Sequence, residues 1–133
     1  MCNLITHSLQ AAKPEERDRI FSGIGTDHLS PNDARSIDDV IRAYLEQVEA
    51  VQKRGGRMIM MASRALARIA NSAKEYETVY AKVLDACDKP VILHWLGDMF
   101  DPQLKNYWGA DTFETALETS LRVIEANAAK IDG

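Results

Sequence analysis

Polar side chains suited to acid–base and binding chemistry follow three separate apolar runs of the sequence. They are Thr26 and Asp27 after the first run, Ser63 and Arg64 after the second, and His94 and Asp98 after the third. Carboxylates and imidazoles can exchange protons with a substrate, and histidine does so near neutral pH. A guanidinium binds a carboxylate or phosphate through a planar pair of donors. Together these residue types favour a site that binds a small anion and moves protons.

The apolar runs have the length and composition of strands buried on both faces of a parallel sheet. They are Ile20–Ile24, Arg57–Ala62 and Val91–Leu96, and a fourth begins at Ile131. In parallel α/β folds, functional groups gather where strands end. The polar residues stand at those ends, so we expect them to share one edge of the sheet.

Amphipathic helices are predicted between the strands. The first runs from Ile37 to Val51, with Ser36 and Asp39 at the spacing of a capping box. The other expected cap pairs are Ser72 with Glu75 and Asp111 with Glu114. The last helix is expected to bury a face that contains Phe113, Ala116, Leu117, Leu121 and Ile124, and a shorter N-terminal helix ends at Pro14. Strands alternating with helices predict an α/β fold with right-handed crossovers.

Each candidate residue also has an ordinary structural interpretation. Asp27 and His28 suit a solvated strand-to-helix turn, Arg64 an exposed helix start, and His94 a hydrogen-bonded core residue. The Gly23–His28 segment lacks the third glycine of a dinucleotide fingerprint. Metal-ligand types occur at Asp27, His28, His94 and Asp98, but their spacing matches no ligand motif. We therefore predict neither a metal site nor a bound cofactor.

Composition narrows the class of protein. The chain has 133 residues, 46% of them hydrophobic, and a net charge of −4, which suits one globular domain over 1–133. The mild acidity argues against a nucleic-acid binder. No apolar run approaches the roughly 20 residues of a membrane helix. The segment Met1–Gln10 lacks the pattern of a secretory signal. The two cysteines, Cys2 and Cys87, suit reduced thiols. We therefore expect a cytoplasmic protein.

Four strings of the sequence, taken in order, resemble the DUF993 branch of the dihydrodipicolinate synthase family. They are Gly23–Leu29, Met60–Ala67, Pro90–Pro102 and Tyr107–Gly109. The third string is the longest and most specific of them. The resemblance extends from about Asn3 to Gly133.

The resemblance implies a (β/α)₈ TIM barrel, of which this chain would span helix two to the start of strand six. A complete barrel needs about 250 residues. Relatives form a Schiff base between a strand-six lysine and a 2-oxo acid, which makes carbon–carbon bond formation or cleavage feasible. That lysine would follow Ile131–Gly133, so the chain alone is expected to be inactive. Lys130 stands before the strand, at the opposite end from the active face.

The expected function is therefore part of a class I aldolase-type lyase that acts on a small 2-oxo acid or aldol substrate. Arg64 would bind a carboxylate, with Thr26, Ser63 and Asp98 as further binding residues, while Asp27 and His94 would handle protons. One alternative is a non-enzymatic α/β module that associates through open sheet edges. A weaker one is a metal-dependent aldolase or hydrolase. Open edges also predict a homo-oligomer.

Overall fold

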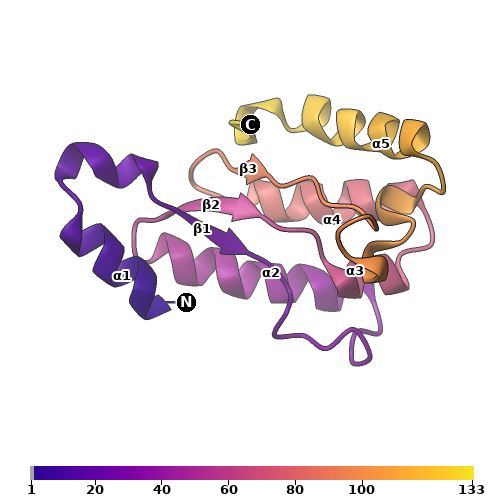
Figure 1. The fold of residues 1–133 in the computed structure, drawn as a ribbon, viewed down its shortest axis with the longest axis horizontal. Helices are drawn as coiled ribbons and strands as arrows, with labels where there is room; N and C mark the ends of the chain where they lie inside the picture. Colours follow the sequence, from indigo (N-terminus) through magenta and orange to yellow (C-terminus); the bar gives the residue numbers. More distant parts are fainter. Residues whose placement is uncertain (1) are drawn as a thin grey trace.

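A small parallel sheet organises the computed structural model, which describes residues 2–133 and, for Cys2, the backbone only (Figure 1). Its strands are β1 (Phe21–Ile24), β2 (Arg57–Met60) and β3 (Ile92–Leu93). The sheet order is β1-β2-β3, with Phe21 opposite Arg57 and Ile59 opposite Ile92. This confirms the α/β class, with strands shorter than the apolar runs.

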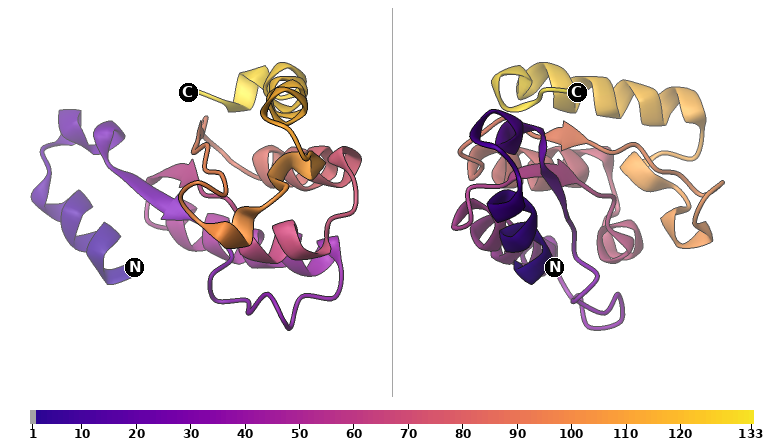
Figure 2. Two further views of the ribbon diagram at one scale, coloured as in Figure 1. Left: turned by 45° about the vertical axis from the view of Figure 1, so that its right-hand side comes forward. Right: turned by 60° about the vertical axis from the view of Figure 1, so that its left-hand side comes forward.

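Helices pack in a layer against the sheet. They are α1 (Cys2–Ala11), α2 (Ile37–Gln52), α3 (Arg64–Ile69), α4 (Ala73–Asp85) and α5 (Phe113–Ala126), with short 3₁₀ turns η1 (Pro14–Arg19), η2 (Pro102–Leu104), η3 (Tyr107–Gly109) and η4 (Ala128–Lys130). Figures 1 and 2 show α2 and α4 along one face of the sheet, with α1 near β1 and α5 beyond β3. None of the helices in residues 2–133 is both long and apolar enough to span a bilayer.

The core lies between the strands and the α2–α4 layer. Alternate strand residues, among them Ile24, Met58 and Met60, are buried, as the two-residue period of a strand requires. Tyr44 from α2 and Tyr80 from α4 are buried against them. The thiol of Cys87 is also buried, and burial raises its pKa to about 11, so it stays protonated.

The expected helix starts are confirmed at two positions and wrong at one. Ser36 caps α2 in a full capping box with Asp39. Ser72 caps α4 by accepting from the Glu75 N–H. At α5 the cap is Thr112, whose hydroxyl accepts from the Thr115 N–H, rather than Asp111. The two residues are adjacent and both of capping type, so local pattern did not separate them.

The fourth predicted strand is reduced to one bridge. Ile131 pairs in parallel with Val91, and the Leu93 N–H donates to the Gly133 carbonyl over 2.7 Å. The Arg57 guanidinium bonds the Asp132 carboxylate across this edge. The C-terminal residues therefore continue the sheet order beyond β3.

The predicted buried face of α5 is mostly wrong. Phe113, Leu117, Leu121 and Ile124 are exposed, and only Ala116 of the expected set is buried. The buried face instead has the small residues Ala116, Thr119, Ser120 and Val123, which let α5 approach α4 and η3 closely. Periodicity correctly identified an apolar stripe on this helix. It did not show that a different stripe of the helix packs against the protein.

The segment between β3 and α5 turns sharply through left-handed backbone. Asn106, Trp108 and Gly109 have φ of 58°, 71° and 68°. A Cβ on Gly109 would lie 2.5 Å from the backbone N of Ala73, closer than real contacts allow. Only glycine therefore lets this segment close onto the start of α4.

We expect Gly109→Ala to lower the free energy of unfolding by more than about 2 kcal/mol, because left-handed strain and a backbone clash add. Gly55→Ala is the matched control. Gly55 has φ of 75° with nothing near its Cβ position, so it should lose only about 1 kcal/mol. Urea unfolding followed by circular dichroism measures both, and equal losses would contradict the clash.

Candidate functional site

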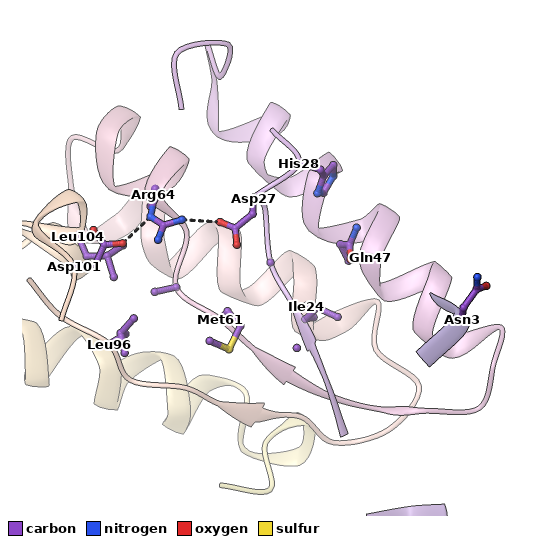
Figure 3. A pocket seen from close by; sticks show the side chains of 13 residues that line it. Asn3, Ile24, Asp27, His28, Gln47, Met61, Arg64, Leu96, Asp101 and Leu104 are labelled. Atoms are coloured by element: carbon purple, nitrogen blue, oxygen red, sulfur yellow. Dashed lines mark hydrogen bonds and ion pairs between the residues drawn. The ribbon is translucent and has the colours of Figure 1, made fainter. Parts of the chain in front are cut away.

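A cleft of about 840 Å³ opens at the carboxyl ends of the strands (Figure 3). Its polar lining includes Asp27 and His28 after β1, Arg64 at the start of α3, and Asp101 from the segment after β3. Gly23, Met61 and Leu96 are among the remaining lining residues. The expectation that residues following different strands share one edge is met for Asp27 and Arg64.

Arg64 lies between two carboxylates toward one end of the cleft (Figure 3). Its Nε donates to Asp101 Oδ2 over 2.6 Å, and Nη1 donates to Asp27 Oδ1 over 3.2 Å (Figure 3). The hydrogen bond and charge of Asp101, and then the charge of Asp27, raise the pKa of the guanidinium above its usual value. The two partners differ in exposure, because the Asp101 side chain is 14% exposed and that of Asp27 is 82% exposed.

A buried hydrogen bond lies directly beneath this ion pair. Thr26 and Ser63 share a bond of 2.6 Å between their hydroxyls, and both residues are buried. Their chain neighbours are Asp27 and Arg64, so the lower contact fixes the spacing of the upper one. Ser63 also caps α3 by accepting from the Leu66 N–H. Thr26 and Ser63, predicted to bind substrate, thus sit inside the protein below the cleft.

Buried tyrosines complete the support. The Tyr107 hydroxyl accepts from the Ser63 backbone N–H over 3.1 Å and lies 3.1 Å from the Tyr80 hydroxyl. The Tyr44 hydroxyl donates to the Met61 carbonyl. Burial raises the pKa of all three phenols, so they remain neutral hydrogen-bonding groups rather than bases. Tyr44, Tyr76 and Tyr80 are all buried in the core.

Other predicted residues lie apart from the Arg64 centre. His28 is at the rim, where its Nε2 is 3.1 Å from a carboxylate oxygen of Glu46 on α2. His94 is exposed just after β3 and is not part of the cleft lining, although its backbone N–H donates to the Met60 carbonyl. Asp98 lines a second, smaller cavity. Within residues 2–133 no three His, Cys, Asp or Glu side chains are grouped to hold a metal.

Sequence reasoning missed Asp101 as a site residue. The local signal was present, since Asp101 precedes a proline and caps η2 by accepting from the Gln103 N–H. That signal predicts a cap, however, and not a contact with Arg64, which lies 37 residues earlier in the chain. The fold turns a capping carboxylate into the main partner of the cleft's cation.

The chain belongs to a protein family whose model, described as "Protein of unknown function (DUF993)", matches residues 1–133. The match supports the DUF993 part of the resemblance drawn from the sequence. No curated protein matches the chain.

Hydrogen bonds from the Gln103 N–H and then from Arg64 lower the pKa of Asp101. Because the folded-state pKa is the lower one, the carboxylate stabilises the fold above its unfolded-state pKa and loses this effect as pH falls through the folded value. We expect Arg64→Met to raise the Asp101 pKa only part of the way, since the Gln103 donor remains. Carboxyl ¹³C NMR titration measures this. A full return to the ordinary value would show that Arg64 alone was responsible.

Proposed function

We propose that these residues form part of a (β/α)₈ barrel enzyme, an aldolase-type lyase that acts on a small 2-oxo acid, and that the cleft binds the acid's carboxylate. The parallel order β1-β2-β3-Ile131 supports the barrel, because each crossover leads to the adjacent strand position. The family resemblance supports the chemistry. The binding role rests on one observation. Asp101 is less exposed than Asp27 and makes the shorter hydrogen bond to Arg64.

Exchange of carboxylates follows from that inequality. With two carboxylates and one guanidinium, the resting centre has a net charge of −1, so an added anion needs one partner to leave. Asp27 is the partner that leaves, because it is more exposed and makes the longer bond, while Asp101 keeps Arg64 in place. The substrate carboxylate would take the position of Asp27 against Nη1. Surface ion pairs of this kind stabilise by only about 0.2–1 kcal/mol, so displacing Asp27 requires little free energy.

Proton handling would then fall to the displaced carboxylate. Once released from Arg64, Asp27 is a free base beside the bound acid. We retain His94 as a second proton-transfer residue, because it follows β3 as Asp27 follows β1. None of the described residues that line the cleft is a lysine. The Schiff-base nucleophile of this proposal therefore comes from outside them.

We expect pyruvate to bind this chain, as followed by ¹H–¹⁵N NMR of the backbone amides that line the cleft, and its uncharged methyl ester to bind much more weakly. Arg64→Met should weaken pyruvate binding about 10- to 100-fold, because it removes the charge-assisted hydrogen bonds to the substrate and also leaves Asp27 and Asp101 uncompensated beside the anion. Asp27→Asn should tighten it about two- to fivefold, because the internal competitor loses its charge.

Two controls keep this test specific. Arg42→Met removes an exposed guanidinium from α2 and should leave affinity unchanged. His94→Gln should also leave affinity unchanged, because His94 is assigned to proton transfer rather than binding. Pyruvate binding that survives Arg64→Met, or that weakens in Asp27→Asn, would contradict the carboxylate exchange.

A second candidate function, association with another copy through open edges, is favoured by the exposed stripe on α5. Phe113, Leu117, Leu121 and Ile124 place four large apolar side chains in contact with water. Within the described residues β1 pairs only with β2, so its outer backbone groups are also free to pair. Both features lie at the outer ends of the sheet and helix layers.

If this association occurs, sedimentation velocity should show a coefficient that rises with protein concentration. Leu117→Glu with Leu121→Glu should shift the chain to monomer, because charges would then be buried without partners. Leu4→Glu, on the exposed side of α1, is the matched control and should change little if α5 is the contact. A wild-type chain that stays monomeric over the whole range would reject this function.

A further inference from the structure

A second cavity of about 160 Å³ lies beside the cleft and has aromatic walls. It is bounded by the segment after β3 and the start of α5, and it shares only Leu96 and Leu104 with the cleft lining. Trp95 is one of its lining residues, and the centroid of its ring lies 5.8 Å from that of Trp108 and 6.0 Å from that of Phe113. The rings are tilted by 32° and 58° at the distances of aromatic contacts, so together they form one continuous aromatic wall of the cavity.

Three energetic costs meet at this cavity. Trp95 and Phe113 keep large apolar surfaces in water, at 39% and 66% exposure. Trp108 is a bulky residue held at φ of 71°, which costs on the order of 1–3 kcal/mol. Its indole N–H is buried without an acceptor among residues 2–133, and Trp108 as a whole is only 4% exposed. Costs of this kind cluster where a ligand recovers them.

The charge of the lining indicates the ligand's sign. Asp98 and Asp111 line the cavity, and no lysine or arginine does. In residues 2–133 neither side chain has a hydrogen bond or ion pair, unlike Asp27 and Asp101 in the cleft. The cavity therefore combines aromatic surface with two uncompensated negative charges.

We propose that this cavity binds a small organic ammonium ion, with methylated nitrogen against the exposed rings of Trp95 and Phe113 and beside the two carboxylates. Aromatic faces attract such cations, and nearby carboxylates add to the attraction. The volume equals about five water molecules at about 30 Å³ each, enough for a trimethylammonium group. A bare metal ion fits less well, because the walls are carbon-rich and the two carboxylates are the only anionic ligands. The site is independent of the function proposed for the cleft.

The experiment uses the fluorescence of the chain's two tryptophans, both of which line this cavity. Choline is titrated against 3,3-dimethylbutan-1-ol, which has the same shape and hydroxyl but a carbon in place of the charged nitrogen. Sodium chloride is titrated in parallel to correct for ionic strength. We expect saturable quenching by choline at a half-saturation about tenfold lower than that of the neutral alcohol, consistent with a cation–π attraction of about 1–2 kcal/mol.

Variants test the assignment of charge. Asp98→Asn with Asp111→Asn should remove most of choline's advantage while leaving the neutral alcohol's binding unchanged. Asp85→Asn, an exposed aspartate at the far end of α4, should leave choline binding unchanged. Circular dichroism establishes that each variant folds, and the comparison of the two ligands on the unaltered chain does not depend on them.

Two results would overturn the proposal. Equal half-saturation for choline and the alcohol would show an apolar cavity with no preference for cations. Choline quenching no greater than that of sodium chloride would show no site at all. Failure of pyruvate to bind the cleft would not affect either result, since none of the residues that bind choline holds Arg64.

Discussion

The buried hydrogen bond between Thr26 and Ser63 is the constraint on which the cleft depends. These hydroxyls are removed from water, so each must find a partner, and at 2.6 Å they satisfy one another. The contact ties the end of β1 to the residue that caps α3. Because Asp27 follows Thr26 and Arg64 follows Ser63 in the sequence, the two charged side chains are brought within hydrogen-bond distance above it.

The segment after β3 also contacts Ser63 and Arg64. Tyr107 accepts from the Ser63 N–H, and Asp101 accepts from Arg64, so one buried and one half-exposed contact fix this segment against the first two strand ends. Gly109 closes it onto α4, and Trp108 is packed between Tyr80 and Trp95. The strained backbone therefore lies in a segment that borders both the cleft and the aromatic cavity.

The two hollows differ in how their charges are balanced. In the cleft both described carboxylates near Arg64 are paired with it. Asp101 is held tightly and Asp27 loosely. In the aromatic cavity the carboxylates are unpaired, and the rings of Trp95 and Phe113 are exposed. Paired charges with one weak member suit exchange with an anion, whereas unpaired carboxylates beside rings suit a cation. The contrast arises within a single connection, since Asp98 and Asp101 are three residues apart.

The sequence by itself determined the local features: the parallel α/β class, the positions of the strands, the Ser36 and Ser72 caps, and the convergence of Asp27 with Arg64 at the strand ends. These depend on side-chain period, capping chemistry and the direction of parallel strands, all of which are readable over a few residues. Only the tertiary structure decided that Asp101 holds Arg64, that Thr26 and Ser63 lie beneath the site, and that α5 turns its large apolar side chains outward. These are contacts between residues far apart in the chain, and periodicity shows that a face is apolar without showing which neighbour, if any, covers it.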